Sequence, residues 1–296
     1  MRHLKIYEMI EAVHWAGSIR KAAEDMNITA SALNRRIQAF EKEFGADVFE
    51  RLPRGMRLNT AGELLLRHIR FQRQDFTRVQ SQVIDLSGVR RGHVKIACSQ
   101  ALLPYFLPQQ ISLYRSEFPG VTFSVKVRDR IQAELDLSTF ESDLALVFEP
   151  VHMVDFEVLH AVPQPIMAVM SQDHPLSTQP ELRLRDCLDY DLVLPDRQYG
   201  VRFLLEQAAK RLRRNLEPIL ETESFEMVRH YAAYGKSIGF QIPVGLNKVA
   251  RPELAYIPLA ERDVAVGELL LGHLRGRTLP VAALKFASQI ATALHN

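Results

Sequence analysis

The sequence predicts a multidomain chain, in which a helical winged helix-turn-helix and a long linker helix precede an α/β domain of two subdomains. Three observations predict this fold class. Residues 1–59 alternate short helical patterns with turn signals, and residues 60–88 form one uninterrupted amphipathic helical pattern. From residue 92 onward, short β-rich runs alternate with helical stretches. A chain of 296 residues is also long enough for more than one domain.

Composition narrows the class of protein. Hydrophobic residues make up 47% and charged residues 24% of the chain, as in ordinary globular proteins. No run approaches the roughly 20 apolar residues that cross a bilayer, and the N-terminus lacks a signal-peptide pattern. We therefore expect a cytoplasmic protein without a membrane partner. Two cysteines, Cys98 and Cys187, are too few for a disulfide framework or a structural zinc site, so we expect no metal.

The charge is unevenly distributed along the chain. Residues 1–90 hold 15 Lys and Arg against 11 Asp and Glu, whereas the remainder holds 22 against 24. The basic N-terminal third favours a phosphate-rich partner, although many solvated surfaces carry as much charge.

Two short helices joined by a tight turn are expected near the N-terminus. Ser18 is a favourable N-cap for a helix over residues 19–26, and Asn27 can adopt the left-handed conformation that ends such a helix. Thr29 then caps a second helix. Apolar residues recur along it at four, three and four positions, which predicts one buried stripe of Leu33, Ile37, Phe40 and Phe44.

The opposite side of the second helix carries Ser31, Asn34, Arg35 and Gln38, which all form hydrogen bonds and are not acidic. A polar, basic helix after a tight turn is typical of a recognition helix that enters the major groove of DNA. Arginine can donate two hydrogen bonds to guanine and asparagine can pair with adenine, so Arg35 and Asn34 are the expected base readers. An ordinary solvated helix face is the alternative.

A hairpin wing is expected next. Arg51, Arg54 and Arg57 lie around a Pro-Arg-Gly turn between the apolar anchors Phe49 and Leu58. Arginines at the tip of a hairpin would reach the phosphate backbone or the minor groove beside the recognition helix.

The long helix is expected to start at a capping box, Thr60-Ala-Gly-Glu63. An apolar seam at alternating spacings of four and three follows: Leu65, Ile69, Gln72, Phe76, Val79, Val83 and Leu86. Such a seam favours pairing with a second copy, and packing against its own domain is the alternative.

Taken together, these motifs resemble those of the LysR-type regulator family. The resemblance rests on Ala16-Gly17-Ser18, Ala22-Ala23, Ser31-Ala32-Leu33-Asn34-Arg35-Arg36-Ile37, Phe40-Glu41, Phe49-Glu50-Arg51, Arg54-Gly55 and Leu58-Asn59-Thr60-Ala61-Gly62-Glu63. It implies that Ala30, Ser31, Asn34 and Arg35 lie at the DNA, with wing residues near Arg54 and Arg57. The chain departs from the family where Asn34 replaces the commoner serine and Ile19 replaces an aromatic residue or leucine.

The resemblance also implies function and partners. The protein would be a transcription regulator that binds inverted-repeat operators in double-stranded DNA, forms a homodimer or homotetramer and contacts RNA polymerase. Residues 1–59 would be the DNA-binding domain and residues 60–88 the dimerisation helix. The expected DNA contacts are Ser18, Thr29, Ala30, Ser31, Asn34, Arg35, Gln38, Arg51, Arg54 and Arg57.

Residues 92–296 are similar to the family's effector-binding domain, which is periplasmic-binding-protein-like. Strands are expected at residues 93–98, 121–127, 144–148, 166–170 and 192–194. Subdomain I would comprise residues 92–162 and 268–296, and subdomain II residues 163–267, joined by crossing strands near 162–166 and 264–269.

Ligands of open α/β sheets bind at the carboxyl ends of the strands. By strand order and by resemblance, an effector cleft would collect Ser99, Gln100, Arg130, Ile131, Phe148, Arg197, Arg202 and Phe225. The arginines indicate an anionic small molecule such as a carboxylate, with surface solvation as the alternative for each. We expect this co-inducer and no cofactor.

Three other functions are weighed against a regulator. An enzyme is disfavoured because the sequence has no Gly-x-Ser-x-Gly, P-loop or His-Glu-x-x-His motif. Redox sensing is disfavoured because Cys98 lies in an apolar strand pattern and Cys187 has no nearby second cysteine. A sequence-tolerant DNA-coating protein would not need some 200 residues of α/β domain.

Overall fold

The computed structural model describes residues 2–52, 55–85, 91–152, 154–247 and 249–295. Arg54 and Leu86, which belong to the predicted wing and seam, lie outside these described residues. The chain divides into two compact units, Met1–Thr77 and Arg78–Asn296, and each is described by itself. No helix in the described part of the chain is both long enough and apolar enough to cross a membrane.

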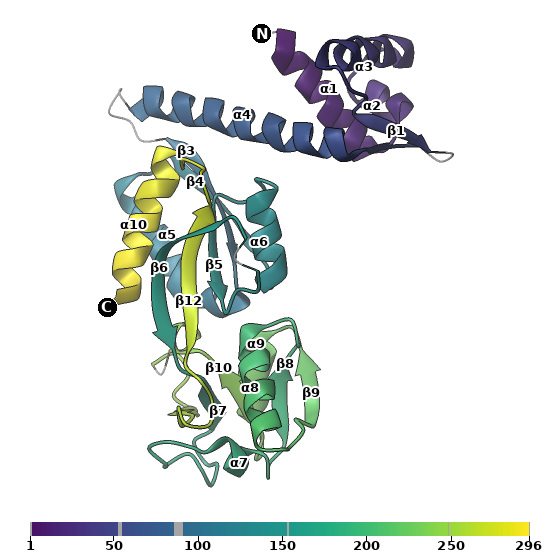
Figure 1. The fold of residues 1–296 in the computed structure, drawn as a ribbon. Helices are drawn as coiled ribbons and strands as arrows, with labels where there is room; N and C mark the ends of the chain where they lie inside the picture. The colour runs from purple at the N-terminus through teal and green to yellow at the C-terminus, as the bar shows by residue number, and fades with distance from the viewer. Residues whose placement is uncertain (1, 53–54, 86–90, 153, 248, 296) are drawn as a thin grey trace. The chain divides into compact units, whose positions relative to one another are not determined.

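The first unit confirms the predicted winged helix-turn-helix (Figure 1). Its elements are α1 (Arg2–Ala16), α2 (Ile19–Asp25), α3 (Ala30–Phe44), β1 (Phe49–Leu52), β2 (Gly55–Leu58) and the first half of α4 (Thr60–Asp85). The two strands form an antiparallel hairpin in which Phe49 pairs with Leu58. One apolar core joins the helices, with Ile10, Leu33 and Ile69 among its fully buried side chains.

The turn between α2 and α3 has the predicted chemistry. Asn27 adopts a left-handed conformation with φ of 55°, and the Thr29 hydroxyl accepts a hydrogen bond from the Ala32 amide at 3.3 Å. Ser18 occupies the N-cap position of α2 in an extended conformation, but its side chain makes no capping hydrogen bond. Gly45 ends α3 with φ of 83°.

Two predicted details of this unit are wrong. Phe44 is exposed rather than buried, because the last turn of α3 extends past the core and its ring stacks on Phe40 with centroids 5.5 Å apart. The residue that caps α4 is Asn59 rather than Thr60. Its Oδ1 accepts a hydrogen bond from the Gly62 amide at 2.9 Å, so the helix starts with Thr60 already inside it.

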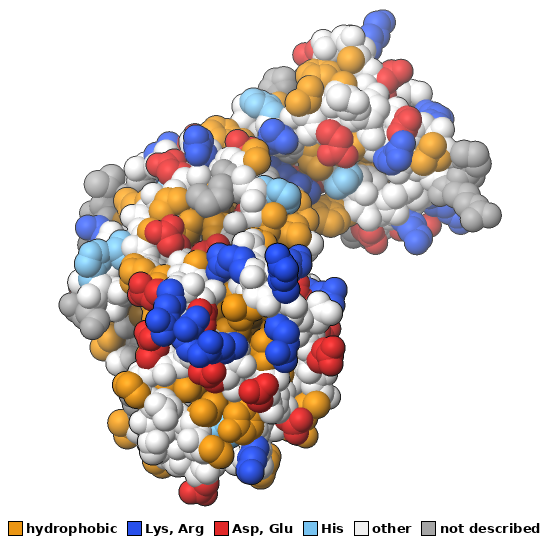
Figure 2. Space-filling model, turned by 60° about the horizontal axis from the view of Figure 1, so that its bottom comes forward, with side chains coloured by type: hydrophobic (Ala, Val, Ile, Leu, Met, Phe, Trp, Pro, Cys, Tyr) orange, Lys and Arg blue, Asp and Glu red, His pale blue; other side chains and the backbone are white. Residues whose placement is uncertain are grey.

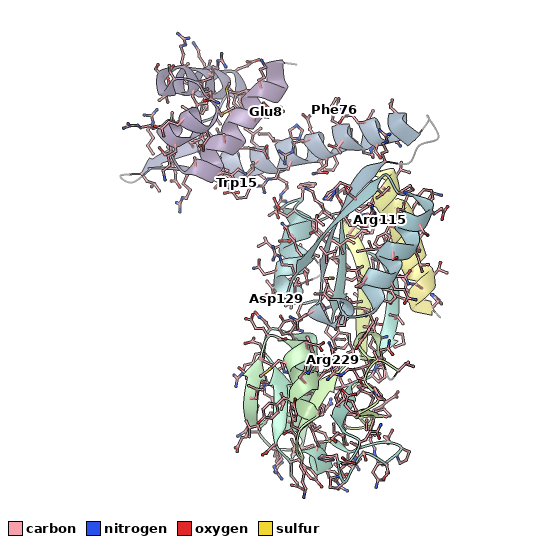
Figure 3. All side chains as sticks on the ribbon, turned by 180° about the vertical axis from the view of Figure 1, so that it is seen from behind. Glu8, Trp15, Phe76, Arg115, Asp129 and Arg229 are labelled. Atoms are coloured by element: carbon pink, nitrogen blue, oxygen red, sulfur yellow. The ribbon has the colours of Figure 1, made fainter. Side chains whose placement is uncertain are left out.

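The predicted seam along α4 divides into two parts. Leu65 and Ile69 are buried in the core of the first unit, so this half of the helix packs against its own domain, which was the alternative to pairing. The described positions of the second half are exposed: Gln72, Phe76, Val79 and Val83 (Phe76 is labelled in Figure 3). This second half is an apolar helix face without a cover in the chain's own described core.

The second unit contains two five-stranded sheets, which define two lobes (Figure 1). The first lobe has the strand order β4 (Val121–Val127), β3 (Gly92–Cys98), β5 (Leu144–Phe148), β12 (Gly267–Leu274) and β6 (Phe156–Gln164). Strands β4, β3 and β5 are parallel, whereas β12 is antiparallel to both β5 and β6. Its helices are α5 (Phe106–Glu117), α6 (Arg130–Ser138) and α10 (Val281–His295), with a short 3₁₀ turn, η1 (Gln100–Leu102).

The second lobe has the strand order β11 (Leu254–Pro258), β7 (Met167–Ser171), β10 (Ile238–Gln241), β8 (Leu192–Pro195) and β9 (Pro218–Thr222). It carries α7 (Leu184–Cys187), α8 (Gly200–Arg211), α9 (Phe225–Ala232) and the 3₁₀ turn η2 (Pro243–Gly245). The chain enters this lobe after β6 and leaves it before β12. Two connections therefore join the lobes, in accord with the predicted α/β fold of two subdomains.

A nearly buried ion pair fixes one corner of the second lobe. The guanidinium of Arg183 donates two hydrogen bonds of 2.6 Å to the carboxylate of Asp263, which also accepts from the Leu184 amide at 3.1 Å. The Asp263 side chain is 4% exposed. The hydrogen bond from Arg183 lowers the pKa of Asp263, and the pair ties the start of α7 to the segment that leads into β12.

Replacement of Asp263 by Asn is expected to destabilise the protein by about 1–3 kcal/mol at neutral pH, because the Arg183 charge loses its partner. A lowered carboxyl pKa stabilises the fold above the unfolded-state value, so the difference from the parent should persist down to about pH 4 and shrink below it. Urea unfolding across this pH range checks the expectation. An equal stability of parent and Asp263→Asn at pH 7 would contradict it.

Candidate functional site

The outward face of α3 is the first candidate site. Leu33 and Ile37 are buried on its inner side. The other side presents Ala30, Ser31, Arg35 and Gln38 as exposed residues and Asn34 as a half-buried one, and Thr29 is exposed at the N-cap. The predicted set on the helix is therefore brought together on one accessible face of a 15-residue helix.

The wing lies beside this face. The Arg51 guanidinium donates a hydrogen bond of 3.3 Å to Oδ1 of Asn34, so a wing residue touches the expected reading helix. Arg57 instead pairs with Glu50 across the hairpin at 2.6 Å, which offsets its charge. A groove of about 1050 Å³ lies between α3 and the wing, lined by residues of both.

Two glycines set the position of the wing. The Met56 amide donates a hydrogen bond of 2.8 Å to the Gly17 carbonyl, which joins β2 to the turn between α1 and α2. Gly55 has φ of 140°, and a Cβ atom on it would lie 2.5 Å from the Gly17 oxygen. Only glycine permits this close approach of two backbones. Ser18 follows Gly17 directly, so the same contact brings the predicted residue Ser18 near the wing.

The second candidate site is a cavity between the two lobes of the second unit. It is lined by Ser99, Ala101, Arg128, Arg130, Val147, Phe148, Tyr199, Gly200, Val201, Phe225 and Ile242. Four predicted residues, Ser99, Arg130, Phe148 and Phe225, are thus brought together. The cavity has a volume of about 10 Å³, which is about the room that one water molecule needs.

Arg130 supplies the charge of this cavity. It begins α6 just after Asp129, whose carboxylate caps the helix by accepting from the Ile131 and Gln132 amides at 2.8 Å. The Arg130 guanidinium donates to the Glu149 carbonyl at 3.0 Å and lies 4.5 Å from the Phe203 ring. Its Nε is buried without a hydrogen-bond partner, and burial lowers the pKa of Arg130.

Arg130 is thus a half-buried cation with an unused donor. No ion pair involves it among the described residues, although the charges of Glu149, Glu134 and Asp129 act on it from nearby. On the face seen in Figure 2, several Lys and Arg side chains gather in one region, with Asp and Glu side chains around them. The Arg130 side chain favours an anion, because a charge-assisted hydrogen bond would satisfy both the charge and the donor.

The remaining predicted residues lie outside the lining. Arg202 is buried, but its guanidinium pairs with Glu206 and Glu221 at 2.9 Å each, so its charge is already compensated. Arg197 is exposed and lies 3.5 Å from Glu206. Ile131 is exposed on α6. The Gln100 side-chain oxygen accepts a hydrogen bond from the Phe225 amide, which links the two lobes next to the cavity.

Sequence reasoning missed several lining residues: Ala101, Arg128, Val147, Tyr199, Gly200, Val201 and Ile242. Arg128 follows β4 directly, and the position of a cation after a parallel strand was a signal that could have found it. Its Nε pairs with Asp136 at 2.9 Å. The others are apolar or small, and nothing in the sequence separates them from core residues.

Neither cysteine has the features of a redox sensor. Both are fully buried, and burial raises the pKa of Cys98 and of Cys187 to about 12, which suppresses the reactive thiolate. In the described parts of the chain, no three His, Cys, Asp or Glu side chains gather as a metal site would require.

A winged helix-turn-helix with a polar outward helix, joined to a two-lobed α/β domain with a charged cleft, defines the class of effector-responsive DNA-binding proteins. Two family models match the chain. Residues 4–63 match the bacterial regulatory helix-turn-helix protein, lysR family, and residues 87–294 match the LysR substrate binding domain. The chain belongs to the LysR family of transcription regulators, which are not enzymes.

Individual relatives agree with this assignment. The chain is 25% identical to the HTH-type transcriptional activator CmpR of Synechocystis over 231 residues, 77% of this chain and 75% of CmpR. The fold is similar to that of full-length CbnR complexed with its target DNA, with a TM-score of 0.62 and 16% identity over 98% of this chain and 99% of that one. It is also similar to the CcmR regulatory domain of Synechocystis in complex with 2-PG, with a TM-score of 0.62 and 22% identity over 70% of this chain and 99% of that one.

Replacement of Gly55 by Ala is expected to displace the wing, because the added Cβ would overlap the Gly17 carbonyl and the backbone favours glycine. DNA affinity should fall about tenfold or more while the helical content is retained. Binding to DNA selected by the parent protein, together with circular dichroism, measures both. Gly45→Ala is the matched control, since its Cβ would meet nothing within 4 Å although its φ is also positive. A similar loss of affinity in both variants would contradict the role of the Gly17 contact.

Proposed function

We propose that this protein binds an inverted-repeat operator as a dimer and that a small anion in the interlobe cleft alters this binding. The observation that carries the DNA-binding part is the accessible polar face of α3, which the wing residue Arg51 touches through Asn34. In this proposal residues 1–59 bind DNA, residues 60–88 dimerise, and residues 92–296 bind the effector. Subdomain I comprises 92–162 with 268–296, and subdomain II comprises 163–267.

Recognition of DNA would divide between two sets of residues. Arg35 and Asn34 read base edges from the helix, supported by Ala30, Ser31 and Gln38. Ser18, Thr29, Arg51, Arg54 and Arg57 contact the backbone or the minor groove. Arg51 has no acidic partner among the described residues and is therefore the stronger wing candidate, whereas Arg57 must leave Glu50 or share it.

The assembly proposal rests on the uncovered part of α4. Phe76, Val79 and Val83 recur at spacings of three and four and are exposed, which suits a helix-to-helix contact with a second copy. Two recognition helices on paired half-sites multiply modest individual affinities, and this favours an inverted repeat. A homotetramer and a contact with RNA polymerase, in the cytoplasm, complete the proposal on the strength of family membership.

The effector proposal rests on Arg130. A small carboxylate or another small anion would accept from its unused Nε and from the Ser99 hydroxyl, both of which belong to the cleft. A relative of similar fold binds the small molecule 2-PG in its regulatory domain. The ligand would shift the protein between two states only as far as its affinities for them differ.

Replacement of Arg35 by Ala is expected to weaken operator binding by about 1–3 kcal/mol and to relax base preference, because a bidentate donor to guanine is lost. The measurement is affinity for DNA selected from a random library by the parent, against scrambled DNA at fixed salt. Arg36→Ala is the matched control, since it removes the same charge from the groove between α3 and α1. Equal losses for both variants would contradict base reading by Arg35.

Replacement of Arg130 by Met is expected to weaken the binding of acetate or inorganic phosphate roughly tenfold or more, because a charge-assisted hydrogen bond is lost. Calorimetric titration and ligand-induced thermal stabilisation of the whole protein measure this. Arg197→Met removes an equal charge from an exposed site outside the cavity and should leave anion affinity within about twofold. The proposal fails if Arg197→Met loses as much affinity as Arg130→Met.

A further inference from the structure

A hydrogen bond between the two lobes satisfies a backbone amide at the N-terminus of α9. The first amides of a helix have no acceptor within the helix. In α9 the Ser224 hydroxyl accepts from the Met227 amide at 3.2 Å, and the Phe225 amide donates to the side-chain oxygen of Gln100. Ser224 belongs to the second lobe itself, whereas Gln100 comes from η1 of the first lobe (the Arg229 label in Figure 3 marks α9). One orphan amide of the second lobe is therefore satisfied across the cleft.

Two glycines allow the lobes to meet this closely. A Cβ on Gly200, the first residue of α8, would lie 2.7 Å from the Phe148 carbonyl oxygen. A Cβ on Gly245 would lie 2.8 Å from the Ala101 carbonyl oxygen. Both glycines belong to the second lobe and both carbonyls to the first, so backbone meets backbone without intervening side chains. Because of these close contacts, the cavity that remains between the lobes has a volume of only about 10 Å³.

An effector and this arrangement compete for the same space. A carboxylate needs more room than one water molecule, so it can enter only if the lobes separate or Gln100 moves. The N-terminus of a helix also favours an anionic oxygen over the neutral amide oxygen of glutamine. An anion that displaced Gln100 would bind both the α9 amide and the Arg130 guanidinium, which faces the same cavity.

We infer that Gln100 is an internal latch: its side-chain oxygen occupies the place of an effector oxygen at the start of α9, and an anion opens the cleft by displacing it. This inference rests on the proposed effector site. In this inference Gln100 borders the cleft but opposes anion binding. The bound anion widens the gap between the lobes rather than narrowing it.

The test uses three variants of the whole protein. Gln100→Leu removes the acceptor at similar size, and Gln100→Glu keeps an acceptor and adds a negative charge at the helix start. Gln109→Leu, on the exposed surface of α5, is the matched control. Amide hydrogen exchange of residues 223–228 measures the latch without any ligand, and titration with acetate and with inorganic phosphate measures anion affinity.

With Gln100→Leu, exchange at Phe225 should become roughly two- to tenfold faster and anion affinity should rise by a similar factor, as one neutral hydrogen bond provides. With Gln100→Glu, exchange should slow and anion affinity should fall, whereas Gln109→Leu should match the parent in both. Unchanged exchange in Gln100→Leu, or weaker anion binding by it, would overturn the latch. If exchange responds as expected and no anion binds even the parent, the Gln100 hydrogen bond between the lobes is supported, whereas its displacement by an anion is overturned together with the proposed effector class.

Discussion

Burial of Leu33 and Ile37 fixes the rotation of α3 about its axis, and the DNA-binding proposal depends on that rotation. With these side chains in the core, residues at positions 31, 35 and 38 point outward because of the 3.6-residue period. A turn of α3 by one residue, or about 100°, would bury Asn34 and Gln38 in place of Leu33 and Ile37, at a cost on the order of several kcal/mol for the unpaired amide groups and the lost apolar burial. The wing is joined to the turn between α1 and α2 by the Gly17 and Gly55 contact and to α3 by the hydrogen bond from Arg51 to Asn34.

The buried arginines of the second unit differ in whether a carboxylate compensates their charge, and this difference distinguishes a structural role from a candidate binding role. Arg202 pairs with Glu206 and Glu221, Arg229 with Glu226, and Arg277 with Asp143. A buried charge is costly unless it is paired, and each of these three has a carboxylate partner within its own lobe. A buried Nε without a hydrogen bond is found at Arg229 as well as at Arg130, so the carboxylate partner is what separates the two. Among the described residues Arg130 forms no ion pair: its guanidinium donates to a carbonyl and faces an aromatic ring, its Nε has no hydrogen bond, and the charges of Glu149, Glu134 and Asp129 act on it from a distance. A half-buried cation that no carboxylate contacts directly is suited to bind an anion.

The sequence was sufficient where the determinants are local. The strands 121–127 and 144–148 were predicted with their limits, and the left-handed Asn27 and the Thr29 cap follow from side-chain chemistry alone. The prediction for Phe44 was wrong because helical periodicity does not reveal where the neighbouring core ends. Arg202 and Arg130 could not be distinguished in sequence, because the Glu221 that compensates Arg202 comes from a neighbouring strand. Gly200 and Gly245 were missed since their role is the absence of a side chain.

The energies of the cleft set how strongly an effector can act. The Gln100 hydrogen bond to Phe225 is neutral and contributes about 0.5–1.5 kcal/mol, whereas an anion on Arg130 would form charge-assisted bonds of about 1.5–3 kcal/mol. Their difference, about 0–2.5 kcal/mol, overlaps the roughly 1–3 kcal/mol of typical allosteric coupling and is well short of the roughly 5.5 kcal/mol that a complete switch from 1:99 to 99:1 requires. Binding at a single site of this kind would therefore shift the populations of the two states only in part. A sharper response must come from several copies acting on one operator, which is a physical reason for the exposed α4 seam to pair.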